Sequence, residues 1–505
     1  PHRQQHVAHG VAPTHSLRKP MALAEHTAEI EATNVWAGVV VGSVLASTAL
    51  GAALDVWFRR RRQRSGEQQL EGGKAFWSLF LLGASYVVLV PGVLVLLFEY
   101  DLSLVLLGIT KPLSTASEST IQLIQRMFKL GNIAAAVFLC LYAMVIPALK
   151  IVFLVLGQYL QVGGDVGRMR WARRCILLVQ GISKWASPDT FAYILMLCLF
   201  RNLNKPPSLL SECNLGLGFT CFSTFCVGST IASLGIRVPS SSVDAQEAAV
   251  PSKAPALGRR SAMFAVATLA LAFAALMCVG LALPSLELYL DMNLLYENQP
   301  TLKALSSIID SLGLPALLHT DVGIWQAIQH LGAGACQGEI NSIIAFLMYS
   351  VFVVLFPVLD MLVLLLVACM AQRQYSAAHG KARQRLLAVS RVLRKVGMLD
   401  VSLVGVILIT LSLEQMRSNG VILSVRSGAF ILIGAEACHY LAACLVAHAF
   451  APLASESDSM GKAASVKGGD DSENSTDIES TSSGDTKEDS EGEVRELEAD
   501  VRVKA

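Results

Sequence analysis

This sequence has few charged residues, and its cysteines do not occur in closely spaced pairs. Asp, Glu, Lys and Arg make up 16% of its 505 residues, whereas soluble domains carry about a quarter. Apolar residues make up 53%, and the mean hydropathy is +0.53. A chain this apolar has too little charge to cover a soluble surface, so the composition predicts an integral membrane protein.

The motifs of several kinds of site are also missing. The eleven cysteines include no CxxC or CxxxC pair and no Cys/His cluster at zinc spacing, so no metal site is predicted. There is no Gly-rich phosphate loop and no nucleophile constellation, so we expect neither an enzyme nor a cofactor. No basic stretch is interleaved with aromatic residues, so no nucleic-acid partner is expected. Cys213 and Cys336 lie in predicted external loops, where a disulfide and two free thiols are both open.

The two ends of the chain are polar. Residues 1–35 contain no short apolar run with a cleavage site, so no signal peptide is predicted, and Met21 is a plausible start. Between Ser455 and Ala505 there are 15 Asp and Glu against 6 Lys and Arg. Large apolar residues are few there, so residues 451–505 are predicted to form a disordered acidic tail.

Long apolar segments dominate the rest of the chain. A helix needs about 20 residues to cross the hydrocarbon layer, and nine segments come near that length. Because lipid offers no partner to backbone polar groups, all nine are expected to be helices in an all-α, polytopic fold. The predicted spans are 36–57, 77–98, 132–157, 186–200, 215–235, 262–284, 342–370, 397–414 and 427–450.

Lysine and arginine are distributed unevenly over the connections between these spans. Four alternate connections hold 22 of them and the other four hold 8, which predicts that the richer set is cytoplasmic. The N-terminus is then outside and the C-terminus cytoplasmic, in a plasma or organelle membrane. The run RRRRQR at 59–64 is either a topology signal or a site for anionic headgroups.

Small residues recur every four positions in the first predicted helix, at Gly38, Gly42 and Ala46. This spacing lets a second helix approach closely. The neighbour is either a helix of the same bundle or the same helix of a second chain, so the sequence leaves the oligomeric state open.

Two stretches far apart in the chain share unusual features. In each, a proline in mid-helix is followed three positions later by a charged residue: Lys150 follows Pro147, and Asp360 follows Pro357. Each stretch leads through a basic connection to a short helix that begins with an aspartate. The matched order predicts a duplicated four-helix module. The predicted boundaries are 1–35 (polar segment), 36–76 (extra helix and basic loop), 77–237 (first module), 238–261 (linker), 262–450 (second module) and 451–505 (tail).

At these positions the sequence resembles the paraquat-inducible protein A family, which includes the LetA-type proteins. The first module contains PALK at 147–150 and WASPD at 185–189, and the second contains GMLDV at 397–401. The resemblance implies two repeats of four helices and transport of phospholipid between membranes, with membrane lipids as cargo and an MCE-domain protein as partner. The chain departs from the family pattern in lacking a CxxC zinc ribbon and in having Asp360 where a lysine is expected.

Charged residues inside the predicted spans are candidate lipid- or substrate-binding residues, because each costs at least about 2.5–3.5 kcal/mol to place in lipid. Lys150 could bind a phosphate headgroup or form an ion pair with Asp189. Asp189 and Asp400 begin their helices, where a carboxylate caps free N–H groups. Asp360 has no evident cation nearby, so it is either protonated or paired with another module.

The last predicted helix carries Glu436 and His439, three residues apart on one face. Such a pair can bind a metal in a helix bundle, but only with a second copy that this sequence lacks. We therefore expect a hydrogen-bonded pair beside a polar crevice. Pro147 and Pro357 either kink their helices, which would open a lateral groove, or are tolerated in packed helices.

The longest predicted external connection is 285–341. Within it, residues 300–318 have apolar residues at helical spacing, which predicts an interfacial amphipathic helix and a surface on which a partner could dock.

The sequence thus favours a component of an intermembrane phospholipid transport system. A secondary transporter of small solutes and a scaffold without transport activity are the alternatives. Repeats, broken helices and intramembrane charge also occur in transporters, but many of these invert their repeats, whereas here both modules start on the same face.

Overall fold

The computed structural model describes residues 15–64, 75–106, 109–161, 166–206, 209–236, 238, 259–291, 294, 319–372, 377–414, 417 and 421–450. The chain divides into two compact units, Pro1–Ser455 and Glu456–Ala505, and every described residue belongs to the first. The predicted interfacial helix at 300–318 and the predicted disordered tail at 451–505 lie outside the described residues.

After a long first helix, α1 (His15–Arg64), the described residues form two halves with the same order of elements. The first half comprises α2 (Phe76–Leu94), β1 (Leu96–Leu106), β2 (Ile109–Ser119), α3 (Thr120–Lys129), α4 (Ile133–Cys140), the π-helical η1 (Leu141–Val145), α5 (Ile146–Gln161), α6 (Val166–Ile182), the 3-10 turn η2 (Ser183–Ala186), α7 (Pro188–Leu203), β3 (Leu209–Leu215) and α8 (Leu217–Gly235). The second half comprises α10 (Arg259–Ala282), β4 (Leu286–Leu290), β5 (Thr320–Val322), α15 (Ile324–Cys336), α16 (Ile340–Leu347), the π-helical η3 (Met348–Leu355), α17 (Phe356–Gln372), α18 (Ala377–Val396), α19 (Leu399–Leu413), β6 (Val421–Val425) and α20 (Ser427–Phe450). Duplication as the origin of this shared order stays a prediction.

Eight described helical segments are long and apolar enough to cross a membrane, as expected for a multi-pass membrane protein. Nine spans are therefore not confirmed. The difference lies at the predicted span 186–200, which corresponds to α7. This helix has 16 residues, 14 of them buried, and is shorter than the about 20 residues that a crossing requires. α7 is surrounded by protein and not by lipid.

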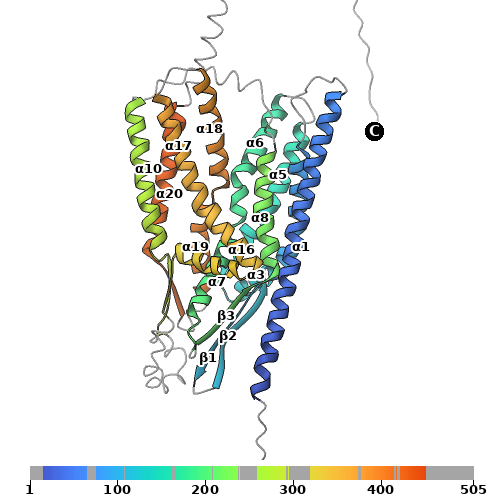
Figure 1. Cartoon of the computed structure of the whole chain (residues 1–505), viewed down its shortest axis with the longest axis vertical. Helices are drawn as coiled ribbons and strands as arrows, with labels where there is room; N and C mark the ends of the chain where they lie inside the picture. Colours follow the sequence, from blue (N-terminus) through green and yellow to red (C-terminus); the bar gives the residue numbers. More distant parts are fainter. Residues whose placement is uncertain are drawn as a thin grey trace, which may run out of the picture. The chain divides into compact units, whose positions relative to one another are not determined.

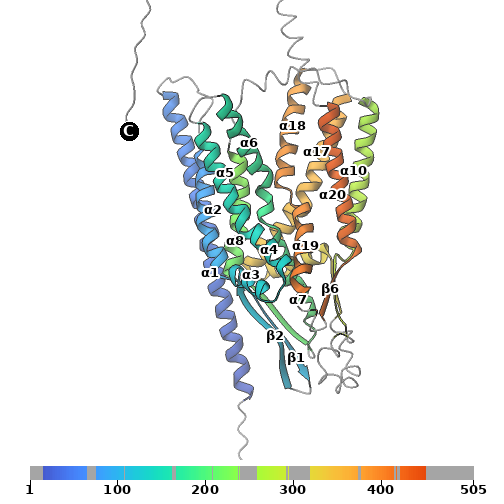
Figure 2. The ribbon, with the colours of Figure 1, turned by 180° about the vertical axis from the view of Figure 1, so that it is seen from behind.

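The predicted α-helical, multi-pass fold is confirmed, but the sequence did not predict the three-stranded antiparallel sheet that each half forms at one end of the bundle. The strand orders are β2-β1-β3 and β5-β4-β6. Both sheets lie at the end of the bundle from which α1 begins (Figures 1 and 2). The predicted span 77–98 overran into β1 because the apolar run continues past the helix end at Leu94 without a polar break.

α1 packs on α2 through a glycine and a buried carboxylate. A Cβ on Gly51 would lie 2.8 Å from the Cα of Trp77, so the two helices touch there backbone to backbone. Asp55 lies one turn further along and accepts the N–H groups of Phe76 at 2.8 Å and Trp77 at 3.2 Å. Because the residue before α2 offers no side-chain cap, Asp55 caps α2 from the neighbouring helix.

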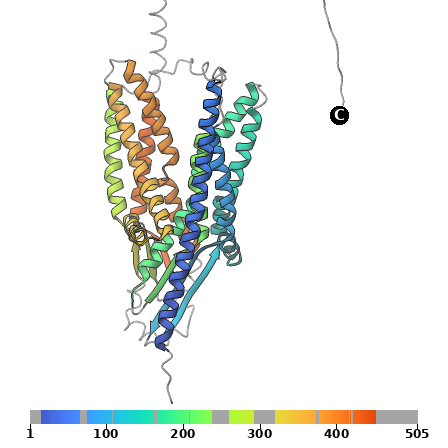
Figure 3. The ribbon, with the colours of Figure 1, turned by 45° about the vertical axis from the view of Figure 1, so that its right-hand side comes forward.

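The small-residue stripe of α1 does not form this contact. Gly38, Gly42 and Ala46 are exposed, and a Cβ on Gly42 would meet nothing within 4 Å. A Cβ on Gly38 would lie 3.8 Å from Cδ1 of Ile340. The first helix therefore packs against its own bundle, as expected, chiefly through Gly51, and contact of the exposed part of the stripe with a second chain stays a prediction. Towards its N-terminus α1 continues past the other helices on the side of the sheets (Figures 1 and 3).

Pro147 and Pro357 each follow a π-helical segment. Because proline has no N–H, the carbonyl five residues earlier in a π-helical turn has no intrahelical donor. In the second half this carbonyl belongs to Phe352, and it accepts the N–H of Met398 at 2.9 Å. The proline therefore helps to fix the start of α19 against η3.

α7 and α19 cross at the centre and join the two halves. A Cβ on Gly405 of α19 would lie 2.8 Å from the carbonyl oxygen of Pro188 and 2.9 Å from the Cβ of Phe191. The Phe191 ring packs edge-to-face on Tyr349 of the second half, with 5.3 Å between ring centroids. Buried apolar residues of both halves form one continuous cluster, so the halves share a core.

Two glycines lie in turns that a side chain would disfavour. Gly131 and Gly338 have φ angles of +78° and +84°, a conformation that favours glycine. Each lies in the turn that leads into the π-containing helix of its half.

The cysteines form no disulfide. All eleven are free, with Cys213 buried and Cys336 exposed, so the disulfide considered between these two is not formed.

Candidate functional site: two buried polar clusters

The first cluster surrounds Lys150 on α5, whose side chain is fully buried. Its Nζ donates to Oγ of Ser183 at 2.5 Å and to Oγ of Ser229 at 3.0 Å. Ser233 adds a hydroxyl that donates to Ser183 at 3.0 Å. An ammonium has three N–H donors, so one of them lacks a partner among the described residues. Hydroxyl groups satisfy donors but do not neutralise the charge.

Asp189 does not form the expected ion pair with Lys150. It lies in the first turn of α7, fully buried, and its Oδ1 accepts the N–H of Thr190 at 3.0 Å. Its Oδ2 has no hydrogen-bond partner in the described part of the chain. The first half therefore contains a buried lysine and a buried aspartate that do not contact each other.

The second cluster consists of Asp360 on α17 and Glu436 and His439 on α20. Nε2 of His439 lies 2.8 Å from Oδ2 of Asp360, and Nδ1 lies 3.4 Å from Oε2 of Glu436. All three residues are buried, at 0%, 8% and 2% exposure for Asp360, Glu436 and His439. Asp360, for which the sequence offered no partner, is thus paired within its own half, and the imidazole lies between two carboxylates.

The two clusters occupy matching places in the two halves. Lys150 and Ser229 are 79 residues apart, and so are Asp360 and His439. In each half the charged residue three positions after the proline contacts the last helix. The fold therefore repeats the contact and reverses the sign of the charge.

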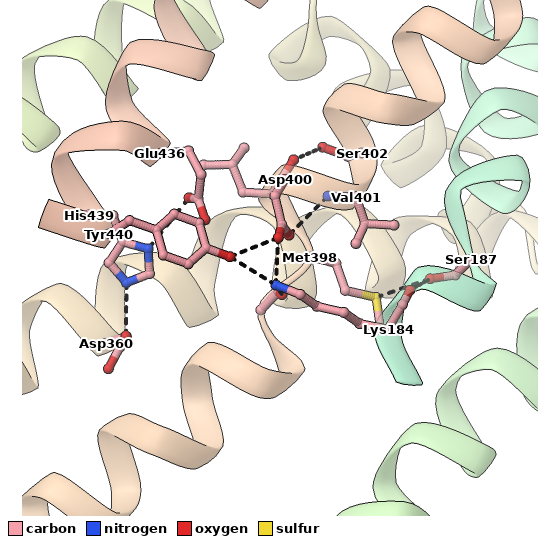
Figure 4. A network of polar contacts seen from close by, with 12 residues as sticks. Lys184, Ser187, Asp360, Met398, Asp400, Val401, Ser402, Glu436, His439 and Tyr440 are labelled. Carbon is pink, nitrogen blue, oxygen red and sulfur yellow. Dashed lines mark hydrogen bonds and ion pairs between the residues drawn. The ribbon is translucent and has the colours of Figure 1, made fainter. Parts of the chain in front are cut away.

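A third set of contacts connects the halves (Figure 4). Nζ of Lys184, on η2 of the first half, lies 2.6 Å from Oδ2 of Asp400 on α19. The hydroxyl of Tyr440 donates to the same oxygen at 2.9 Å, and the backbone N–H of Val401 donates to Oδ1 at 2.9 Å. Asp400 thus accepts a hydrogen bond from a backbone N–H of its own helix, as its place at the helix start predicts. It also forms an ion pair with Lys184 of the other half.

A similar contact runs in the opposite direction. Lys395 of the second half donates to Oε1 of Gln180 on α6 at 2.7 Å, and Gln180 donates to the carbonyls of Ser233 and Ile236 at 3.2 and 3.1 Å. Lys184 and Lys395 therefore each reach from one half to a polar side chain of the other, and Lys205 of the first half also donates to the carbonyl of His319 at 3.2 Å.

Sequence reasoning missed these two lysines, although a signal for them exists. Lys184 and Lys395 each precede the aspartate of a short helix, Asp189 or Asp400, by five positions. The serines around Lys150 carry no comparable signal, because serine is common in apolar helices.

An outer charge cluster lies on the second sheet. Glu287 of β4 forms an ion pair with Arg426, lies 3.0 Å from Nε2 of His319 and accepts a hydrogen bond from Ser424 at 3.1 Å. Arg426, helped by His319 and Ser424, lowers the pKa of Glu287. Asp321 also lies nearby, so the geometry of a metal site is met. Because a guanidinium already neutralises the central carboxylate, we assign the cluster to holding strands and not to binding a metal.

Two hollows lie between the first sheet and the helices. The larger, about 240 Å³, has polar walls that include Glu99, Arg201 and Glu339. The smaller, about 40 Å³, lies among Phe98, Tyr193 and apolar residues of α3 and α19. Neither hollow is lined by residues of the two buried clusters.

Comparison with known proteins gives one match. Residues 320–446 match the family model of paraquat-inducible protein A. Neither the curated proteins nor the solved structures contain a match. The matched region runs from β5 into α20 and contains Asp360, Asp400, Glu436 and His439. The match confirms the resemblance to this family over residues 320–446, which include the GMLDV motif, and the eight helices long enough to cross a membrane show a multi-pass membrane protein. The motifs at 147–150 and 185–189 lie outside the matched region.

Proposed function

We propose that the protein is the membrane component of an intermembrane phospholipid transport system. The match of residues 320–446 to the paraquat-inducible protein A family carries this proposal, because that resemblance implies such a role. The geometry adds a bundle with charged groups buried inside it, which is unfavourable in lipid and is retained in proteins that handle polar cargo.

Lys150 is the residue that we assign to the phosphate of a lipid headgroup. It is a buried cation with hydroxyl partners, no carboxylate partner and one unused N–H donor among the described residues. A phosphate oxygen would accept that donor and neutralise the charge. Since Lys150 is enclosed in this structure, the headgroup reaches it only when α5 separates from α8.

The proposed orientation places the sheets outside the cytoplasm. The end of α1 with Arg59–Arg62 and the starts of the arginine-bearing helices α6, α10 and α18 lie together at the end of the bundle opposite the sheets (Figures 1 and 2). Basic connections stay in the cytoplasm, so the C-terminus follows α20 on that side. The sheets then face the space in which an MCE-domain partner would dock.

Co-purification tests this function. The full chain is extracted in mild detergent, and bound lipids and proteins are identified by mass spectrometry. We expect phospholipid enriched over an unrelated membrane protein of similar size, with less retained by Lys150→Ala and an unchanged amount by the matched exposed variant Lys129→Ala. Recovery of neither phospholipid nor an MCE-domain protein would overturn the proposal.

The alternatives give other outcomes. A secondary transporter of small solutes would retain solute and show no phospholipid enrichment. A scaffold would keep its protein partners in Lys150→Ala and Asp360→Ala and show no transport to lose.

A further inference from the structure

The cluster of Asp360, His439 and Glu436 lies deep in the helix bundle and is incompletely hydrogen-bonded. Oδ1 of Asp360 is buried and has no hydrogen-bond partner among the described residues, and Nδ1 of His439 and Oε2 of Glu436 face each other at 3.4 Å without the geometry of a hydrogen bond. Buried polar atoms are nearly always paired, so this incomplete pairing requires a reason.

The charge of the cluster gives that reason. With a neutral imidazole the group carries two negative charges, and with an imidazolium it carries one. No lysine or arginine contacts these three side chains among the described residues. A net negative charge in a medium of low dielectric constant strongly favours binding of a proton.

The surroundings of His439 contain few other ionisable groups. From α17 only Asp360 reaches it, and from its own helix Glu436 and Tyr440 lie beside it. α10 presents the ring of Phe273, with 5.8 Å between ring centroids. Beyond Tyr440 lie Asp400 of α19 and Lys184 of η2, which neutralise each other, and Arg394 of α18 also interacts with Tyr440. Among the described residues, Asp360 and Glu436 are the charged groups in direct contact with the imidazole.

The geometry favours a proton over a metal ion. Asp360 and Glu436 lie against opposite nitrogens of one imidazole, so their oxygens do not converge on one point as metal ligands must. They form a row of carboxylate, imidazole and carboxylate instead. Glu436 is the most exposed of the three, which places the entry of the row at Glu436 and its inner end at Asp360.

We propose that Asp360, His439 and Glu436 form a proton-binding site that couples proton uptake to the contact between the two halves. One proton passes from a hydronium ion to Nδ1 of His439 through Glu436: an O–H bond breaks, an N–H bond forms, and nothing is oxidised. Release to water reverses the step. Tyr440 links the cluster to the contact between the halves. It follows His439 on α20, and its hydroxyl donates a hydrogen bond to Asp400, the ion-pair partner of Lys184 (Figure 4).

Nitrogen-15 NMR of the imidazoles tests the site in the full chain, reconstituted in nanodiscs. The chain has ten histidines, and the His439 signal is assigned by its loss in His439→Gln. We expect this signal to change with pH as the imidazole gains and loses a proton. Its midpoint should fall in Asp360→Asn and Glu436→Gln, because each removes a carboxylate that favours the bound proton, and it should also move in Asp400→Asn, because the site is coupled to the contact between the halves.

His448→Gln is the matched control, because His448 lies on the same helix and is exposed. It should remove one signal and leave the His439 midpoint in place. If His439→Gln does not fold, Glu436→Gln still identifies the signal, since it must move one resonance that His448→Gln leaves unchanged. A midpoint that is the same in wild type, Asp360→Asn and Glu436→Gln would overturn the proton site, and a midpoint that Asp400→Asn leaves in place would overturn its coupling to the contact between the halves. No lipid cargo enters the measurement, so its result is separate from that of the proposed function.

Discussion

Nε2 of His439 lies 2.8 Å from Oδ2 of Asp360, and both side chains are almost completely shielded, at 2% and 0% exposure. In the first half the same contact joins Lys150 to Ser229, again 79 residues apart. One fold position therefore holds a lone cation in one half and a paired anion in the other. We infer that the halves have divided two tasks, headgroup binding and proton binding, between equivalent places.

The ion pair between Lys184 and Asp400 should stabilise the contact between the halves. Its side chains are 9% and 14% exposed, so Lys184→Met leaves a buried carboxylate without its cation. We expect a loss of about 3 kcal/mol or more in the free energy of unfolding, seen as a lower melting temperature in detergent. The double variant K184M/D400L should recover part of the loss.

A matched pair provides the comparison. Arg201 and Glu339 also join the halves, at 3.0 Å, but are 25% and 27% exposed. Arg201→Met should cost less than Lys184→Met, about 1 kcal/mol, because an ion pair partly open to water contributes less than a buried one. Equal losses for K184M and R201M would contradict the account.

The crossing of α7 and α19 depends on the absence of a side chain at Gly405. In Gly405→Ala the added Cβ would lie 2.8 Å from a backbone oxygen of α7, so the helices must separate. We expect a cost of about 1–3 kcal/mol, as for other overpacked cores. Gly42→Ala, where a Cβ meets nothing within 4 Å, should leave the melting temperature unchanged or raise it slightly. The idea fails if G405A melts like G42A.

Asp55 should act as a cap that is supplied by another helix. Asp55→Ala removes the acceptor of two N–H groups at the start of α2, which should cost about 0.5–2 kcal/mol. Hydrogen exchange should rise at Phe76 and Trp77 and not elsewhere in α2. Ser43→Ala, on the exposed side of α1, is the control and should change neither quantity.

The second sheet should lose stability in acid through Glu287. Arg426 lowers the pKa of this carboxyl in the folded state, so its stabilising contribution is complete above the unfolded pKa of about 4.3. The contribution disappears as the pH falls through the folded pKa. The melting temperature of Glu287→Gln should therefore lie below that of wild type at pH 7, and the two should converge as the pH falls below the folded pKa, which is lower than the unfolded one. A difference that does not change with pH would exclude this ion pair as its source.

The sequence predicted the helices well and the sheets not at all, for a physical reason. An apolar run long enough to cross the membrane must be a helix, because lipid offers no hydrogen-bond partner to its backbone. Eight of the nine predicted spans fall on such helices. β1 begins inside an apolar run, two residues after α2 ends at Leu94, so hydropathy shows no boundary there. α7 looked like a span because a helix buried in protein is as apolar as one in lipid.

The candidate residues were found, but their partners were not. A charged residue in an apolar helix is visible from composition alone, and this identified Lys150, Asp189, Asp360, Asp400, Glu436 and His439. Which of them meet depends on helix packing between positions 79 residues apart or on opposite halves. The proposed pair of Lys150 with Asp189 was therefore wrong, and the pair of Lys184 with Asp400 was missed.

Photo-crosslinking of a phospholipid that carries a diazirine in its headgroup tests the central claim most directly. In nanodiscs, the headgroup should label peptides around Lys150 and Ser229 in α5 and α8, and Lys150→Ala should remove this labelling while Lys129→Ala keeps it. Labelling confined to the ends of α1 and α10, equal in wild type and K150A, would contradict a headgroup site inside the first half.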